Sequence, residues 1–400
     1  MCNNEFGTSN VNIYAELLSC DIEVFAEIPK CYVREKAVVG DFLTYVISKN
    51  KDTIRIYNED TTSADNKLII NWGDGSPYST IEYNYEYVEH TYANNLNNRV
   101  IKIGSPTGVG SPWYDCSNED GDFIQGGSDM ISCTFSDSFA FTKCEGTFAC
   151  TKDSFLIFGV PIFEPNCSLN SMFYNSDMNI NINHWDVSNV VNLSYMFYST
   201  VNFNQPLNNW DVSSVVNMRS MFRKSYNFNQ PLNNWDVSNV TSIAFLFSYS
   251  SFNQDISEWN TSNVETIRGL FSSNSVFNKP LNDLDISNTV DISSVFSGAV
   301  SFNQDLNLWN TASVANMNSA FYNAHSFNQD ISNWNTALVE NMDYMFDETD
   351  YCRDLSAWDT SSLGSTVTLF GRFFCCVDND GEQHSCDGED GAECYLPWCD

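Results

Sequence analysis

The sequence predicts an α+β fold in which an N-terminal β domain precedes a solenoid, with a strand, a turn and a short helix in each repeat. One observation is that FNQPLNNWDVSSVVNMRSMF, residues 203–222, returns almost unchanged as FNQPLNNWDVSNVTSIAFLF over residues 228–247. A second is that the register continues in steps of 24 or 25 residues through Trp185, Trp210, Trp235, Trp259, Leu284, Trp309, Trp334 and Trp358. A fixed period in this range is typical of arrays whose units bury apolar faces against their neighbours.

The N-terminal region, residues 1–104, alternates apolar and polar residues in short runs. The segments IEVFAEI (22–28), FLTYVIS (42–48) and TIRIYN (53–58) are predicted strands. Further along, Trp72 to Gly75 are expected to close a strand and supply its turn, and HTY at 90–92 to open another. These patterns predict a small β domain.

The WGDGS at residues 72–76, followed by HTY at 90–92, resembles the signature of polycystic-kidney-disease-type β-sandwich domains. The resemblance implies a β-sandwich-like domain over residues 1–104. In such a turn Asp74 is expected to bond the turn backbone. His90 is expected to be a structural residue at a strand edge.

Cysteines lie outside the regular repeats and suggest capped ends. Residues 105–169 are predicted to hold a linker, from Gly104 to Gly127, and a disulfide-stapled N-cap, and residues 371–400 a Cys-rich acidic C-terminal cap. The fourteen cysteines are Cys2, Cys20, Cys31, Cys116, Cys133, Cys144, Cys150, Cys167, Cys352, Cys375, Cys376, Cys386, Cys394 and Cys399. An even number placed this way indicates disulfides and an oxidising compartment.

Each repeat between residues 170 and 370 has two apolar patterns. LNNWDV, residues 207–212, has the LxxWxV spacing of a leucine-rich-repeat strand, with Trp at its centre. Val215, Met218 and Phe222 then stand at i, i+3 and i+7, which predicts one face of a short helix. The aromatic phase also extends backwards, through Phe197, Phe173 and Phe148.

The segments FNQPLNNWDVS, FNQDISEWNTS, FNQDLNLWNTA and FNQDISNWNTA make residues 170–370 resemble the BspA-like leucine-rich-repeat surface family, with its mycoplasma-lipoprotein-type repeat. The resemblance implies a secreted or surface-attached, non-enzymatic solenoid used for adhesion or recognition. One unit departs from the pattern, with Lys279, Leu284 and Thr289 in place of Gln, Trp and Val. A weak point or bend is expected there.

Three polar or aromatic columns follow from the repetition. The Asn and Gln of each FNQ are expected to form a buried, mutually bonded amide ladder, and the tryptophans to belong to the core. The residue after each tryptophan is expected on the exposed strand face, as a binding candidate or, alternatively, as a solvated polar face or an Asx turn. This third set, the Asx column, is Asp211, Asp236, Asn260, Asp285, Asn310, Asn335 and Asp359.

Metal binding has one weak candidate in the C-terminal tail. Asp378, Asp380, Asp387 and Asp390 alternate with glycines in a manner that suggests calcium. The spacing does not match an EF-hand loop, so a disulfide-knotted acidic cap is the alternative. No other cofactor is expected.

Composition and motifs together predict a non-enzymatic protein. With 51 acidic and 18 basic side chains and a net charge of −33, the chain repels nucleic acid and anionic lipid. The sequence has no run of 18 apolar residues, so it predicts no membrane span. It also has no nucleophile elbow, phosphate loop, HExxH or Rossmann motif. The first 30 residues lack a signal-peptide pattern, so a mature chain or a fragment is expected if the protein is secreted.

The expected partner is a protein or glycan on a cell surface or matrix, with self-assembly as a further candidate, and the expected location is extracellular or at the cell surface. The alternative is a carbohydrate-binding surface protein that uses its N-terminal β domain.

Overall fold

The chain divides into two compact units, Met1–Val39 and Gly40–Asp400. The computed structural model describes parts of the second unit. They are residues 43–47, 53–58, 68–74, 76–81, 86–92, 99–104, 109–110, 112–114, 130–134, 140–144, 147–151, 156–351, 353–363, 375–377 and 383–385. The strand predicted at 22–28 lies outside them.

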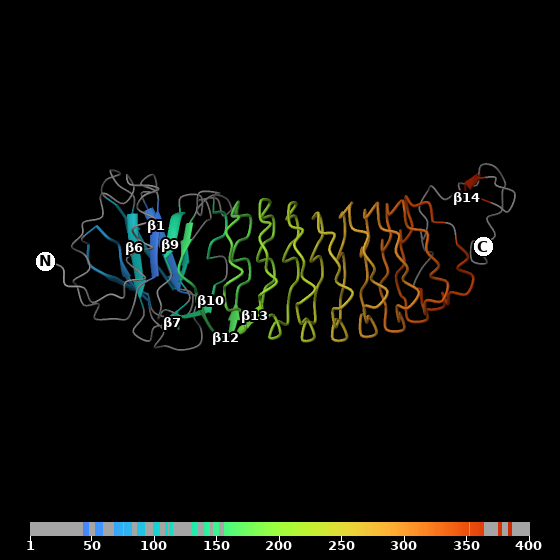
Figure 1. Cartoon of the computed structure of the whole chain (residues 1–400), viewed down its shortest axis with the longest axis horizontal. Helices are drawn as coiled ribbons and strands as arrows, with labels where there is room; N and C mark the ends of the chain where they lie inside the picture. The colour runs from blue at the N-terminus through green and yellow to red at the C-terminus, as the bar shows by residue number, and fades with distance from the viewer. Residues whose placement is uncertain are drawn as a thin grey trace. The chain divides into compact units, whose positions relative to one another are not determined.

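Strands occupy the beginning of the described part (Figure 1). A six-stranded sheet has the order β11-β9-β1-β6-β3-β4. Its members are β11 (Leu156–Phe158), β9 (Met130–Thr134), β1 (Leu43–Ile47), β6 (Arg99–Gly104), β3 (Leu68–Asn71) and β4 (Ser79–Ile81). Within it, β1 pairs antiparallel with both β6 and β9. The strand predicted at 42–48 is confirmed by β1.

A three-stranded sheet has the order β5-β2-β8, with β5 at Glu86–Thr91, β2 at Thr53–Asn58 and β8 at Pro112–Tyr114. The strand predicted at 53–58 is confirmed by β2. The prediction that HTY opens a strand is wrong, because His90 and Thr91 end β5. The predicted linker also contains strands, β8 and β7 (Val109–Gly110).

A four-stranded parallel sheet leads into the repeats. Its order is β13-β12-β10-β7, with β13 at Val190–Asn192, β12 at Ile162–Ser168 and β10 at Ala140–Lys143. Single parallel bridges then continue the ladder, one for each repeat. They pair Asn192, Asn217, Ser242, Thr266, Asp291, Asn316 and Asn341, each with the next. The repeats are therefore stacked turns of chain in parallel register (Figure 1).

The predicted α+β class is wrong for the described residues, since none of them is in a helix and the sheets are small. The segment expected to be helical instead contains a left-handed residue, Ser220 with φ 55°, and another, Lys224 with φ 61°, follows it. A right-handed helix needs φ near −63° at every position. The i, i+3, i+7 spacing correctly predicts burial, because Val215, Met218 and Phe222 have no exposed surface.

We call residues 217–225 and their equivalents in other repeats the turn ribbon. Alternate N–H groups close overlapping turns on the carbonyl three residues back, as Met221 does on Met218 at 3.2 Å. The intervening N–H groups donate to the next repeat, as Phe222 does to Leu246 at 3.0 Å. Buried backbone groups need partners, and this alternation supplies them without a helix or a wide sheet.

The LxxWxV segment is not a strand in the described repeats. Trp210 N–H donates to Leu207 O at 3.1 Å, and Val215 N–H to Val212 O at 2.9 Å, so the segment is a pair of tight turns. From Trp210 to Trp358, each indole also donates to a carbonyl of the preceding repeat. Trp235 Nε1 donates to Leu207 O at 3.0 Å. The tryptophans are almost completely buried, which confirms their predicted place in the core.

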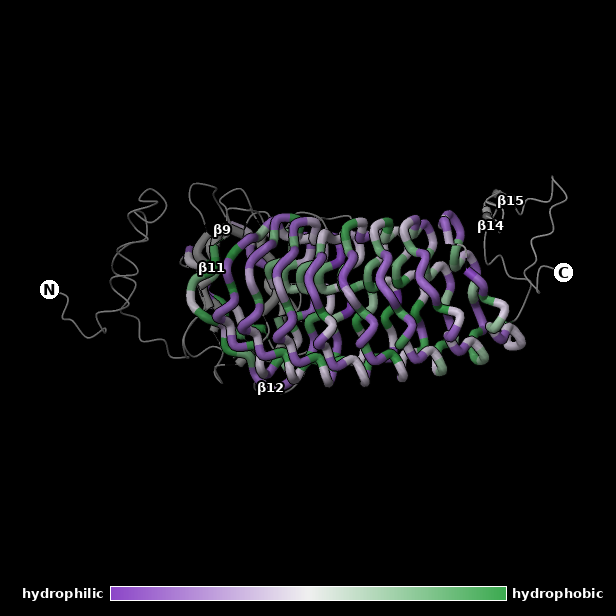
Figure 2. The backbone as a smooth tube through the Cα atoms, turned by 45° about the vertical axis from the view of Figure 1, so that its right-hand side comes forward, coloured by the Kyte–Doolittle hydropathy of each residue, from purple (hydrophilic) through white to green (hydrophobic). Residues whose placement is uncertain are grey.

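Two aromatic columns fill the stack. The first contains Phe173, Phe197, Phe222, Phe247, Phe271, Phe296, Phe321 and Phe346, with neighbouring ring centroids 5.5 to 6.1 Å apart. The second contains Phe203, Phe228, Phe252, Phe277, Phe302, Phe327 and Tyr351. Phe148 stacks on Phe173 at 5.6 Å, which confirms the predicted backward extension. One buried cluster runs from Leu68 to Trp358, and hydrophilic positions line up along successive turns (Figure 2).

Disulfides are not formed by three cysteines in the predicted N-cap. Cys133, Cys144 and Cys167 are free thiols without exposed surface. Burial, above all, and then the adjacent Cys167 raise the pKa of Cys144. A disulfide-stapled cap therefore does not rest on these three residues.

The C-terminal described strands are β14 (Cys375–Val377) and β15 (Gln383–Ser385), which pair antiparallel. No described segment is a helix of the length and apolarity needed to cross a membrane.

Candidate functional site

The Asx column lies on the exposed surface of the stack, in turns and not on a strand face as predicted. Each member is exposed. Its Oδ1 accepts the N–H two residues ahead, at 2.9 to 3.2 Å. In Asp211 the same oxygen also accepts the Ser213 hydroxyl at 2.6 Å. The column is therefore a series of Asx turns, which was one of the two structural alternatives from the sequence.

The Asx turns at Asp236 and Asp285 favour the charged carboxylate. Ser238 lowers the pKa of Asp236, and Ser287 lowers the pKa of Asp285. In each pair the hydrogen bond from the serine hydroxyl has the larger effect, and the bond from the serine N–H has the smaller one. Hydrogen bonds to an ionised carboxylate favour that form. Because adjacent repeats are backbone-paired, the members follow one another at about the strand spacing of 4.8 Å.

A second Asx column was missed in the sequence prediction. Its members stand at the Asp position of the FNQD motif or, for Asp354, at the equivalent position of YCRD, and each Oδ1 accepts the N–H two residues ahead at 2.8 to 3.0 Å. They are Asp255, Asp305, Asp330 and Asp354. The D-x-S spacing shared with WDVS was the available signal at Asp255, Asp330 and Asp354.

The predicted amide ladder is confirmed in its bonding and wrong in its burial. Asn229 N–H donates to Asn204 Oδ1 at 3.0 Å, and Gln230 Nε2 donates to the same oxygen at 3.0 Å. Equivalent backbone bonds of 2.9 to 3.1 Å continue the ladder to Asn328. Its residues are exposed or half-buried, so the bonds close the loops at the surface. At the last step, Arg353 Nη2 donates to Asn328 O at 3.1 Å.

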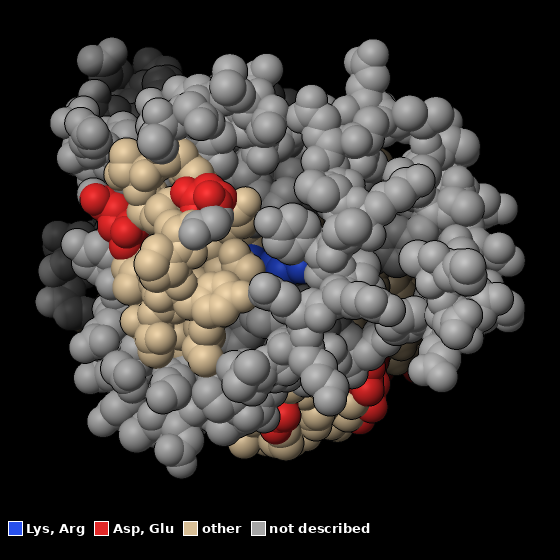
Figure 3. Space-filling model, turned by 90° about the vertical axis from the view of Figure 1, so that its left-hand side faces the viewer, with Lys and Arg blue, Asp and Glu red and all other residues tan. Residues whose placement is uncertain are grey.

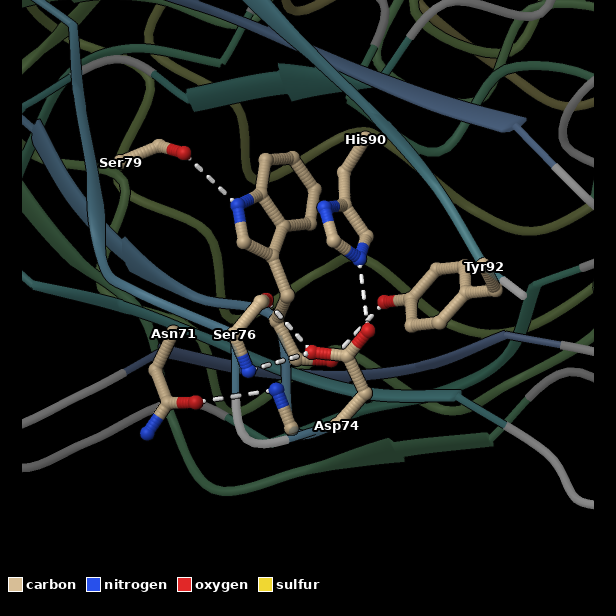
Figure 4. A network of polar contacts seen from close by, with 8 residues as sticks. Asn71, Asp74, Ser76, Ser79, His90 and Tyr92 are labelled. Atoms are coloured by element: carbon tan, nitrogen blue, oxygen red, sulfur yellow. Dashed lines mark hydrogen bonds and ion pairs between the residues drawn. The ribbon is translucent and has the colours of Figure 1, made fainter.

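The WGDGS turn forms a compact polar cluster (Figure 4). Asp74 accepts Ser76 N–H at 3.0 Å and contacts His90 Nε2 at 2.7 Å. The His90 ring stacks on Trp72 with centroids 4.8 Å apart, and Tyr92 donates to Trp72 O at 2.8 Å. This bonding confirms that Asp74 ties the turn backbone.

The electrostatics of Asp74 are consistent with this turn role. Partial burial opposes its ionisation, but the bonds from Ser76 and the proximity of His90 outweigh burial and lower the pKa to about 2. Asp74 therefore stays ionised well below neutral pH.

Metal ligands do not gather in the described part of the chain, where no three His, Cys, Asp or Glu side chains are placed to hold an ion. Asp378, Asp380, Asp387 and Asp390, the calcium candidates, lie outside the described residues. Seen from the end shown in Figure 3, the described charged surface is mainly Asp and Glu, with a small area of Lys or Arg.

Fold and site define a β-rich repeat protein in which backbone-paired turns carry exposed Asx residues. The chain belongs to the family described as Mycoplasma protein of unknown function, DUF285, whose model matches residues 167–283 and 266–375. No curated protein and no solved structure matches the chain. The match supports a mycoplasma-type repeat, whereas the BspA-like and polycystic-kidney-disease-like resemblances remain unconfirmed.

Proposed function

We propose that this chain is a non-enzymatic, secreted or cell-surface module that recognises a protein or glycan through the exposed face of its repeats. The observation that supports the proposal is the Asx column: equivalent residues in successive repeats, each exposed and each held by the same turn. A repeated contact allows several weak interactions to act together.

Charge and rigidity suggest how such a face recognises a partner. The aromatic columns and paired ribbons fix the backbone beneath it, so little freedom is lost when a partner binds. The turn bonds at Asp211, Asp236 and Asp285 use Oδ1. The second carboxylate oxygen, Oδ2, takes no part in these bonds and can accept hydrogen bonds from a partner. A partner with a basic or hydroxyl-rich surface complements these carboxylates.

The test is a charge-removing substitution that keeps the turn. Asn already occupies the column at Asn260, Asn310 and Asn335, where its Oδ1 accepts the same N–H. The variant D211N/D236N/D285N/D359N therefore preserves the fold. We expect its binding to whole cells, matrix or a protein and glycan array to fall by at least about tenfold, which is roughly 1.4 kcal/mol.

The matched control is D255N/D305N/D330N/D354N, which removes the same charge from the second Asx column. It is expected to retain nearly full binding. Unchanged binding in the first variant would exclude the Asx column, and equal losses in both would indicate nonspecific charge. Loss of selective glycan binding on deletion of residues 1–104 would instead favour the N-terminal carbohydrate-binding alternative.

A further inference from the structure

Basic residues are concentrated on one part of the stack. Between residues 170 and 370 the chain has only six, Arg219, Arg223, Lys224, Arg268, Lys279 and Arg353. The guanidinium carbons of Arg219, Arg223 and Arg268 lie 5.6, 4.8 and 5.7 Å from the ring centroid of Phe245. Lys224 Nζ lies 5.6 Å from the ring of Tyr198. We call these four residues the basic patch.

The basic patch has no described carboxylate as an ion-pair partner, although the whole chain carries a net charge of −33. Three guanidinium groups around one ring repel each other, and cation–π contacts offset this only in part. Arg223 also has a buried Nε without a hydrogen-bond partner among the described residues. The patch is therefore suited to an external anionic surface.

The same face of the stack carries the complementary charges. The repeat position of Arg219 is occupied by Asp343 in a later repeat, and that of Arg223 by Asp347. Both sets of carbonyls accept equivalent bonds from the preceding turn ribbon. Tyr195 donates to Arg219 O at 2.9 Å, and Ser319 to Asp343 O at 2.8 Å.

Lys224 is replaced in the same way by Glu348, which is exposed. We call Asp343, Asp347 and Glu348 the acidic patch. Because the turn ribbons are equivalent, both patches project from the same side of the stack.

We propose that this face binds a second copy of the chain about a two-fold axis, so that each basic patch meets the acidic patch of the other copy. A two-fold contact uses the same surface on both molecules. The surface is self-complementary when its ends have opposite charge. The axis then passes midway, between the ribbons 266–274 and 291–299.

Small residues hold most of the matching ribbon positions between the patches, with Tyr249 and Tyr322 as the two large exceptions. Ser248, Ser272, Ser297 and Gly298 occupy ribbon positions that are Arg, Lys, Asp or Glu in the patches. The ring of Phe245 lies over Gly269. Since the two molecules repel at long range, association is expected to be weak in low salt and to strengthen as salt screens that repulsion over a Debye length of about 8 Å.

The test uses the full chain in sedimentation velocity at concentrations up to about 100 μM. Wild type is expected to dimerise. R219E/R223E and D343R/D347R are each expected to be monomeric, because like charges then face each other. Mixing these two variants is expected to produce a heterodimer, since both contacts again join opposite charges. K279E/D330R, a reversal outside both patches, is the control and is expected to dimerise normally.

Recovery in the mixture also demonstrates that both variants are folded. A monomeric wild type under these conditions, or two variants that stay monomeric when mixed while retaining native circular dichroism, would overturn the proposal. A third outcome is a monomeric wild type that binds an immobilised acidic polymer, with this binding lost in R219E/R223E. That outcome would overturn the dimer and assign the basic patch to a different acidic partner. The outcome is independent of the Asx-column substitutions, because the two surfaces share no residue.

Discussion

Gly269 lies directly beneath the ring of Phe245. A Cβ atom at Gly269 would stand 2.3 Å from Cδ1 and Cε1 of that ring, and Gly269 has a φ of +60°. Phe245 occupies the same left-handed position one repeat earlier, with φ 59°. The glycine therefore provides both the conformation and the space that allow the ring to lie flat between repeats.

Gly269→Ala is expected to destabilise the fold by more than about 2 kcal/mol, measured by chemical denaturation. A left-handed Ala costs roughly 1–2 kcal/mol, and displacement of the Phe245 ring adds to this. Gly298→Ala is the control, because its φ is +71° but the nearest atom would be Ser273 Oγ at 3.3 Å. In the Gly269→Ala variant, adding Phe245→Ser should restore the part of the stability that is lost by displacing the ring. Equal effects of the two alanine substitutions would contradict the steric account.

The sequence predicted the period, the buried positions and two of the described N-terminal strands, because these depend on apolar spacing. It failed on secondary structure within each repeat. Val215, Met218 and Phe222 are spaced for a helix, and overlapping turns bury the same positions. The left-handed residues that distinguish the two are mostly serine, tyrosine or asparagine, such as Ser220 and Tyr195. Serine and tyrosine do not favour that conformation, so at most of these positions the residue type did not mark it.

The candidate site was predicted in part. Residues of the Asx column were correctly placed on the surface, but their strand setting was wrong because the LxxWxV segment forms turns. The second column was missed because Asp255 and its equivalents were not considered apart from the FNQ motif that precedes them. The basic patch could not be predicted, since Arg219 and Arg268 are 49 positions apart and meet only through the ring of Phe245.

Lys279→Gln with Leu284→Trp is expected to stabilise the stack by about 2 kcal/mol, assuming about 1 kcal/mol for each new hydrogen bond. Gln254 Nε2 donates to Asn229 Oδ1 at 3.1 Å, and Trp259 Nε1 to Leu232 O at 3.0 Å. The double variant would restore both bonds in the divergent unit. Gln304→Lys removes one such bond and should therefore destabilise the stack. A lower denaturation midpoint in the double variant would show that leucine fits this position better than indole.

The Asp74 carboxyl is expected to titrate near pH 2 in the folded chain, measured by NMR on labelled protein. Its folded pKa lies below the ordinary value of 3.8. The resulting stabilisation is therefore present above pH 3.8 and lost as pH falls through about 2. Ser76→Ala should raise the pKa, because it removes the hydroxyl donor at 2.5 Å. Ser79→Ala is the control, since Ser79 bonds Trp72 and not Asp74. A titration midpoint near 3.8 in wild type would contradict the network.

Cys133, Cys144 and Cys167 are expected to resist alkylation in the native chain and to react after unfolding. The thiolate is the reactive form, and burial raises the pKa of both Cys133 and Cys144. The measurement is iodoacetamide labelling at about pH 8, followed by peptide mass spectrometry that assigns each cysteine separately. Phe173→Ala, which opens the core near the start of the stack, should speed labelling of Cys144 and Cys167. A disulfide found at any of the three in non-reduced protein would contradict the free thiols and restore the stapled cap that the cysteine positions first suggested.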